Sequence, residues 1–308
     1  MKLLLGTKRI PAALRGGVLT IGSFDGLHLG HRELIERTRA RAQASSRPAL
    51  MLSFEPTPRE FLNPDSPPAR LTNFRERWRL LEGSGFDALI VLRFNAALRT
   101  LSGGEFLRLM VEDLGVTGIV VGHDFRFGRH GEASAAFLQA AGPSHGFVVE
   151  VLDPVRVGED RVSSSLVREA LEAFDLARAG RLLGRPYSMR GRVVRGQQLG
   201  RTLGFPTANI RLRRRRIPFK GIFAVWIYGI AATPMGGVAS LGTRPTVGGI
   251  EPLLETAVFD FTGDLYGREL EVEFVAYLRS EVRFESVELM VAQMQVDARE
   301  ARKLTNKT

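Results

Sequence analysis

A stretch of ten residues near the N-terminus carries the clearest chemistry in the sequence. It runs from Gly22 to His31, reads GSFDGLHLGH, and lies between a strand-like run and a helical one. Its glycines let the backbone turn sharply next to a ligand, and the N-terminus of the following helix offers free N–H groups to an anion. Two imidazoles can donate hydrogen bonds to phosphate oxygens. The pattern favours transfer of a nucleotidyl group without a covalent intermediate.

Two other interpretations of these residues have specific difficulties. Asp25, His28 and His31 have the spacing of a metal triad at i, i+3 and i+6. That triad would need a continuous helix across Gly26 and Gly30, and glycine is a poor helix former. The other interpretation, two surface histidines in an ordinary loop, would leave the closely spaced glycines unexplained.

A second anion site is expected at 163–165, where three serines open a helical stretch. Their hydroxyl and backbone N–H groups can bind phosphate, and Arg168, one turn further on, can reach the same oxygens. The same residues also suit a plain helix cap followed by a solvent-facing arginine. The local sequence leaves both interpretations open.

The elements that must position these residues follow from hydrophobic periodicity. In the first half, β-rich runs alternate with longer helical stretches, such as 32–43 and 102–114, which indicates a parallel sheet covered by helices; the runs are 17–22, 49–54, 88–94, 117–122 and 147–152. The second of these helical stretches opens with Ser102 and Glu105 at capping-box spacing. Ligands bind beyond the carboxyl ends of strands in such sheets. The ten-residue segment and Asp124 both fall at such ends.

The second half has a different pattern of secondary structure signals. After a helical stretch over 162–183, Gly184-Arg185-Pro186 reads as a linker, and strand-like runs follow at 187–194, 222–228, 237–241, 254–261 and 270–278. An antiparallel β-barrel ending in a helix from about Ser286 fits this pattern. We therefore expect an α/β domain over 1–184 and a barrel domain over 185–308, each with its own core.

Composition limits the remaining chemistry. The 308 residues include no cysteine, which excludes disulfides, zinc-thiolate sites and thiol nucleophiles. No apolar run is long enough to span a membrane, so we expect a cytoplasmic protein without a membrane partner.

The net charge of +10 is concentrated in the second half, much of it in Arg213–Arg216, which we interpret as a solvated loop. All five histidines lie in the first half, so histidine is not the base of the second.

The ten-residue segment matches the Gly-x-Phe-Asp-Gly-x-His-x-Gly-His signature of the nucleotidyltransferase superfamily. With it, nearly the whole chain resembles the bacterial bifunctional riboflavin kinase/FMN adenylyltransferases, or FAD synthetases. The segments that carry this resemblance are SFEP at 53–56, VGHDFRFG at 121–128, VSSSLVR at 162–168, GRTLGFPTAN at 200–209, KGIFAV at 220–225, GTRPT at 242–246 and DLYG at 264–267.

For the first domain the resemblance implies a Rossmann-like nucleotidyltransferase fold with an FMN adenylyltransferase site, in which His28 and His31 are the catalytic pair. The residues that it implies for binding ATP or FMN are Gly22, Phe24, Asp25, Gly26, Asp124, Ser164, Ser165 and Arg168. Relatives often have Thr at position 165, and Ser keeps the hydroxyl group. Whether Asp124 contacts the nucleotide or a metal ion is left open.

For the barrel the resemblance implies a riboflavin kinase. Mg²⁺ prefers hard oxygen ligands and shares them with ATP phosphates, so the hydroxyl of Thr207 and the carboxamide of Asn209 are the expected magnesium ligands. Gly204, with Gly196 and Gly200, does not form a P-loop, because no Gly-Lys-Ser/Thr follows. We expect these glycines either to shape a flap over the phosphates or to form a structural turn.

Glu255 is a carboxylate in a strand of otherwise apolar and neutral residues. Strand alternation alone could turn it to solvent, whereas the resemblance implies that it is the base for the primary hydroxyl of riboflavin. Position 257 is Ala where relatives often have His, so any contact from that imidazole is missing. Arg279 resembles a residue of the family's flavin-covering flap, with a solvated arginine as the alternative.

The expected activity is therefore bifunctional. The barrel phosphorylates riboflavin to FMN with ATP, and the α/β domain joins FMN to AMP from a second ATP and releases pyrophosphate, both with Mg²⁺. The expected partners are these small molecules and no nucleic acid, and self-association is left open. One alternative has a single working site. Another has a nucleic-acid-binding barrel, whose binding would weaken steeply with salt.

Overall fold

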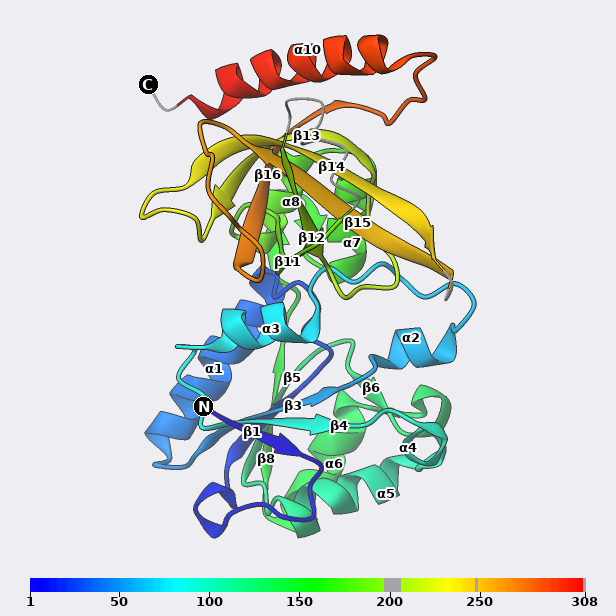
Figure 1. The fold of residues 1–308 in the computed structure, drawn as a ribbon. Coiled ribbons are helices and arrows are strands. Elements are labelled where there is room, and N and C mark those ends of the chain that lie inside the picture. The colour runs from blue at the N-terminus through cyan, green and yellow to red at the C-terminus, as the bar shows by residue number, and fades with distance from the viewer. Residues whose placement is uncertain (197–205, 247–248, 307–308) are drawn as a thin grey trace. The chain divides into compact units, whose positions relative to one another are not determined.

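A computed structural model describes residues 1–196, 206–246 and 249–306 (Figure 1). The chain packs into two compact units: Met1–Pro68 with Arg77–Ser163, and Ala69–Glu76 with Ser164–Thr308. The second unit thus includes a short segment from the first half of the sequence. It also includes the helices α7 (Ser164–Glu172) and α8 (Leu176–Leu183), which precede the boundary expected at residue 184.

The first unit is built on a six-stranded parallel sheet, which confirms the predicted α/β class. The strand order is β1-β4-β3-β2-β5-β8, and the strands are β1 (Lys2–Leu5), β2 (Val18–Ile21), β3 (Ala49–Phe54), β4 (Ala88–Leu92), β5 (Gly118–Gly122) and β8 (Val148–Leu152). The sequence pattern did not indicate β1. This edge strand exposes Leu3 and Leu5, so it lacks the fully buried run by which the inner strands were recognised.

Helices flank this sheet, and those predicted over 32–43 and from Ser102 are present. The helices are α1 (Leu29–Ala44), α2 (Pro58–Leu62), α3 (Phe74–Leu81), α4 (Ala96–Thr100), α5 (Gly103–Arg108) and α6 (Ala135–His145). Short elements complete the unit: η1 (Ala12–Leu14), η2 (Leu109–Asp113), η3 (Arg129–Gly131), β6 (Arg126–Phe127), β7 (Ala133–Ser134), β9 (Arg156–Val157) and β10 (Asp160–Arg161). The capping box expected at Ser102 and Glu105 forms as predicted.

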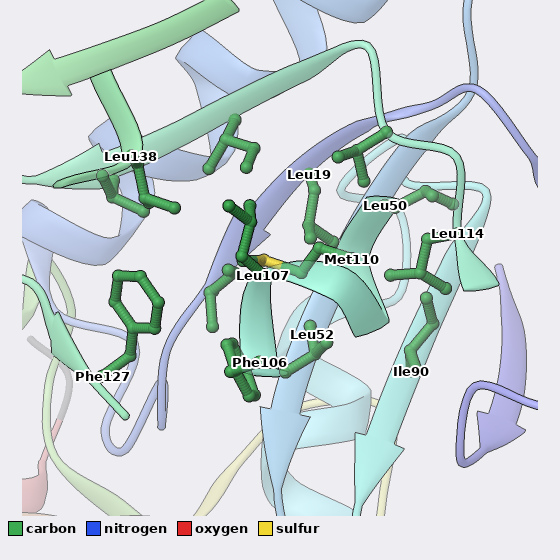
Figure 2. Close-up of a cluster of buried hydrophobic side chains, with 14 of the residues drawn as sticks. Leu19, Leu50, Leu52, Ile90, Phe106, Leu107, Met110, Leu114, Phe127 and Leu138 are labelled. Atoms are coloured by element: carbon green, nitrogen blue, oxygen red, sulfur yellow. The ribbon is translucent and has the colours of Figure 1, made fainter. Parts of the chain in front are cut away.

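One large hydrophobic cluster of the first unit lies between one face of the sheet and the helical segment that carries Phe106 and Met110. Figure 2 shows Leu19, Leu52 and Ile90 on neighbouring strands, packed against Phe106 and Met110. All five side chains are at most 4% exposed. This packing fixes the carboxyl ends of β2, β3 and β5, where the first candidate site lies.

The second unit is a closed antiparallel barrel, also as predicted. Its strand order is β11-β12-β15-β14-β13-β16, and the strands are β11 (Ser188–Val194), β12 (Thr207–Arg211), β13 (Gly221–Tyr228), β14 (Met235–Thr246), β15 (Gly249–Val258) and β16 (Glu269–Arg279). The helix α10 (Val287–Thr305) begins after the N-cap residue Ser286, at the predicted position. The pattern did not indicate β12, which holds the predicted magnesium ligands.

A buried ion pair ties the segment 69–76 into this second unit. The Arg214 side chain is fully buried and its guanidinium pairs with the carboxylate of Glu76. It also donates to the Leu71 carbonyl at 2.9 Å and to the Tyr187 hydroxyl at 3.0 Å. Burial alone would lower the pKa of Arg214, but Glu76 and Tyr187 more than offset that effect and raise it. The interpretation of Arg213–Arg216 as a solvated loop is therefore wrong for Arg214, because tertiary contacts supply a carboxylate partner.

Candidate active sites

The first candidate site is the loop between β2 and α1. Helix α1 begins only at Leu29, with His28 as its N-cap residue. The backbone N–H of His31 donates to the Nδ1 atom of His28 at 3.3 Å. Because Asp25 lies in the loop outside the helix, the continuous helix that a metal triad would require does not form. The glycine-rich segment forms a strand–turn–helix junction, and the N-terminus of such a helix can bind an anion.

The two histidines of this loop form a compact pair. Their rings stack with centroids 3.7 Å apart and planes inclined by 16°. A side chain at Gly30 would place its Cβ only 3.2 Å from the His28 ring, so the glycine makes room for that ring. The ring of Phe24, which is fully buried, lies 5.2 Å from the His31 ring.

The electrostatic surroundings keep His31 neutral. Burial, and then the neighbouring His28 and Arg77, hold the pKa of His31 well below its ordinary value of 6.5. The Nδ1 atom of His31 is buried and has no hydrogen-bond partner among the described residues. A neutral imidazole of this kind has one N–H to donate and one nitrogen that can accept.

Asp124 lies just beyond the carboxyl end of β5, as the sequence predicts. Its side chain is 67% exposed and pairs with Arg161 at 2.5 Å. Sequence reasoning missed Arg161, because the two residues are 37 positions apart and no motif joins them. The contact of Asp124 with a nucleotide or a metal ion stays a prediction.

The serine-rich helix start and Arg168 belong to the second compact unit. Ser164 and Ser165 form the first turn of α7, and the Nε atom of Arg168 donates to the Ala69 carbonyl at 2.6 Å. The arginine is therefore only partly exposed. It is not the solvent-facing arginine that was expected if 163–165 were a simple helix cap. The joint action of these residues and His28 on one ATP stays a prediction.

The second candidate site is a cavity of about 480 Å³ in the barrel. Thr207 and Asn209 both line it, together with Thr262, Asp264 and Tyr266. Thr207 and Asn209 are two residues apart on β12, so their side chains share one face of the strand. The Asn209 side chain is well enclosed, with 6% of the residue exposed.

Gly196, which also lines this cavity, lies close to the Asn209 side chain. A Cβ atom at Gly196 would lie 2.4 Å from the Nδ2 atom of Asn209. The other two glycines of the predicted flap, Gly200 and Gly204, lie outside the described residues. The flap interpretation therefore stays a prediction.

Glu255 lies beside the predicted magnesium ligands. It is the direct register partner of Asn209 on β12 and of Ser240 on β14. Its neighbours Leu254 and Thr256 are fully buried in the barrel core, so Glu255 is on the opposite face of β15, which is also the face of Asn209. Glu255 itself is half-buried. Ala257 is the register partner of Thr207, so this chain has no imidazole at that place.

Arg279, at the end of β16, has an anchored guanidinium group. Its Nε and one terminal nitrogen donate to the carboxylate of Asp297 on α10, at 3.0 and 2.7 Å. Asp297 is only 4% exposed. The alternative of a freely solvated arginine does not describe this side chain, and its contact with flavin stays a prediction.

Together, the folds and sites define a class of two-domain enzymes, in which a nucleotidyltransferase with the HxGH signature precedes a barrel that has the features of a kinase. Two family models cover the chain: one described as FAD synthetase matches residues 10–166, and one described as riboflavin kinase matches residues 183–305. The chain belongs to the bifunctional riboflavin kinase/FMN adenylyltransferase family.

Individual relatives support this assignment over the full length. The bifunctional riboflavin kinase/FMN adenylyltransferase of Escherichia coli K12 is 42% identical over 98% of this chain and 97% of its own length. The one from Pseudomonas fluorescens is 44% identical over 99% and 98%, respectively. A crystal structure titled as a macrolide-efflux protein from Streptococcus pneumoniae is 30% identical, covers 99% of both chains and has a TM-score of 0.83. In the described part of this chain, no helix combines the length and apolarity that a membrane crossing requires.

Proposed function

We propose that this chain makes FMN and then FAD, using one site in each compact unit. In the barrel, the primary hydroxyl of riboflavin attacks the γ-phosphorus of ATP, a new O–P bond forms and ADP leaves. In the α/β unit, a phosphate oxygen of FMN attacks the α-phosphorus of a second ATP and pyrophosphate leaves. The observation that carries this proposal is that a predicted base, Glu255, shares a barrel face with Asn209, in a chain that also has the paired histidines.

In the barrel, Glu255 accepts the proton of the attacking hydroxyl, which is worth roughly a hundred- to ten-thousand-fold in rate. The hydroxyl of Thr207 and the carboxamide oxygen of Asn209 are hard oxygen donors on one side of the cavity, a donor set that suits Mg²⁺. When bound, Mg²⁺ would offset the charge that develops on the transferring phosphate. The enclosed position of Asn209 orients its amide group and limits access of water.

In the α/β unit, the main work is positioning and charge stabilisation. The N–H groups of His28 and His31 and the N-terminus of α1 donate to the phosphate oxygens of ATP as negative charge shifts to the leaving pyrophosphate. Burial, His28 and Arg77 lower the pKa of His31, so its imidazole can donate a hydrogen bond from its N–H without carrying a charge. No covalent intermediate is required.

The substrates are small molecules, and we place the enzyme in the cytoplasm, where ATP is supplied. The decisive experiment is incubation with riboflavin, ATP and Mg²⁺ followed by chromatographic separation of the flavins. We expect FMN to appear first and FAD after it. FMN alone would support the single-site alternative, and no conversion at all would refute the proposal. Binding of RNA or DNA that falls steeply with salt would support the nucleic-acid alternative.

A further inference from the structure

The loop that carries the paired histidines has a backbone that needs outside support. Phe24 and Leu27 have φ angles of +50° and +43°, in the left-handed region that side chains other than glycine rarely adopt. Such residues persist only where the surroundings hold them in place. The placement of His28 and His31 therefore depends on what anchors this turn.

Arg77 supplies such an anchor. Its side chain is 3% exposed, and one terminal nitrogen donates to the carbonyl oxygen of Ser23 at 2.7 Å. Ser23 directly precedes the first strained residue of the loop. The hydroxyl of Ser53, at the end of β3, lies 3.5 Å from the same carbonyl oxygen, at the limit of a hydrogen bond.

The orientation of Arg77 is itself fixed. Its other terminal nitrogen donates to the Oε2 atom of Glu55 at 3.0 Å. Glu55 directly follows β3, and Arg77 lies on α3, so the guanidinium fork joins a helix, the end of a strand and the loop. Hydrogen bonds from a charged, planar donor of this kind are stronger and more directional than neutral ones. Two residues of the SFEP motif at 53–56, the serine and the glutamate, thus contribute to the network around Arg77 and the Ser23 carbonyl.

We propose that Arg77 is a positioning residue for adenylyl transfer, which holds the Ser23 carbonyl so that the strained turn presents His28 and His31 to the triphosphate. This inference rests on the proposed adenylyltransferase function. Arg77 acts through the loop and need not touch substrate. Its loss should therefore disturb the chemical step more than the binding of ATP, because a small misplacement of catalytic groups can cost roughly a hundredfold in rate.

The test uses the full chain and the variants Arg77→Met and Arg77→Lys, with Arg75→Met as the matched control. Arg75 is exposed on the same helix, so its variant removes the same charge without touching the loop. Adenylylation of supplied FMN and phosphorylation of riboflavin are measured on each preparation. For Arg77→Met we expect kcat of adenylylation to fall at least about tenfold, with KM for ATP changed less than about threefold. Phosphorylation should stay at the wild-type rate, and Arg75→Met should resemble wild type in both reactions.

Arg77→Lys should recover part of the lost kcat, because lysine keeps a charged donor near the Ser23 carbonyl. Recovery should be incomplete, because an ammonium group lacks the planar pair of terminal nitrogens that contact Ser23 and Glu55 together. Wild-type kcat in Arg77→Met would overturn the proposal. A parallel loss of both activities in a variant that is folded by circular dichroism would also overturn it, because Arg77 would then not act on adenylyl transfer in particular. If Arg77→Met does not fold, Arg77→Lys decides, and a wild-type kcat in that variant overturns the proposal. Absence of FAD synthesis by the wild-type chain would instead refute the adenylyltransferase function itself.

Discussion

Asn209 on β12 and Glu255 on β15 stand directly opposite each other in the barrel, so their side chains leave the same face of the sheet. Direct cross-strand partners have Cβ atoms roughly 4.5–5.5 Å apart. This places the predicted magnesium ligand and the predicted base close enough to act on one phosphoryl transfer. The relationship also makes the roles of the two residues separable by substitution.

Asn209→Ala should weaken the use of Mg·ATP in riboflavin phosphorylation. The carboxamide oxygen is one of two proposed protein ligands, so we expect the Mg²⁺ concentration for half-maximal rate to rise by at least about tenfold. Adenylylation of supplied FMN by the same preparation serves as the control and should stay near normal. A Mg²⁺ titration that matches wild type would make Asn209 a structural residue.

Glu255→Gln keeps the volume of the side chain but removes its basic oxygen. In the full chain, kcat for phosphorylation should fall at least roughly a hundredfold, with little change in riboflavin affinity measured by fluorescence quenching. Near-normal kcat in the folded variant would remove Glu255 as the base and leave it a role in orienting substrate.

Replacing both His28 and His31 by Ala should abolish FAD formation from FMN while FMN formation from riboflavin continues. The reason is that both rings lie in the α/β unit, on the loop that follows β2, and the predicted kinase residues all lie in the barrel. Chromatography of the two reactions gives the readout. Simultaneous loss of both activities, with the fold intact by circular dichroism, would contradict the separation of sites.

The lowered pKa of His31 predicts an acid-sensitive contribution to stability. Burial, His28 and Arg77 make the folded chain bind this proton less tightly than the unfolded chain, whose histidine titrates near 6.5. Since the unfolded state then binds more protons, the free energy of unfolding falls as the pH drops below about 6.5. His31→Asn should flatten this decline between about pH 7 and pH 5 in denaturant titrations. The exposed His145→Asn variant is the control for the loss of an imidazole, and an equal slope in wild type and His31→Asn would contradict the prediction.

Removing the buried charge of Arg214 should destabilise the second unit strongly. Arg214→Met leaves the carboxylate of Glu76, itself 8% exposed, without its cation, and breaking such a pair costs about 3–5 kcal/mol. Adding Glu76→Gln should recover part of that loss, because the uncompensated charge is then gone. Denaturant unfolding of the single and double variants tests this. Additive losses would show that the ion pair is not coupled.

The same ion pair changes the expectation for an isolated barrel fragment. The sequence predicts that residues 185–308 hold a complete core, and yet Glu76 and the Leu71 carbonyl that Arg214 contacts lie outside that range. A fragment cut at 185 would bury Arg214 without its carboxylate. We expect it to unfold at lower denaturant concentration than the barrel does in the full chain.

Much of the fold follows from local patterns, because buried parallel strands and alternating barrel strands have different hydrophobic periods. The five strand-like runs of the first half and the capping box at Ser102 needed no tertiary information. Among the strands of the six-stranded sheet and the barrel, those missed were β1, an exposed edge strand, and β12, a short strand in a segment whose glycines and proline read as a turn. Hydrophobic period is a weak signal in both.

Some residues of the candidate sites can be predicted from the local sequence, and others are found only through their tertiary contacts. The spacing of His28 and His31 is enough to select them as candidate site residues. The face of the strand on which Glu255 lies becomes clear only when its register partners are known. Arg77 and Arg214 could not have been selected, since a single arginine among many has no local signature. Their roles come from partners distant in the sequence, 54 residues away for Ser23 and 138 for Glu76.

The division of the second unit between two stretches of chain has a consequence for its synthesis. Glu76 leaves the ribosome 138 residues ahead of Arg214. At roughly 5–20 residues per second, its carboxylate is made on the order of ten seconds before its partner exists. The sheet of the α/β unit, whose last strand ends at Leu152, can form during that interval, before Arg214 is available to the Glu76 carboxylate. Translation order thus makes the first domain the earlier one to fold and leaves one part of the barrel to be completed last.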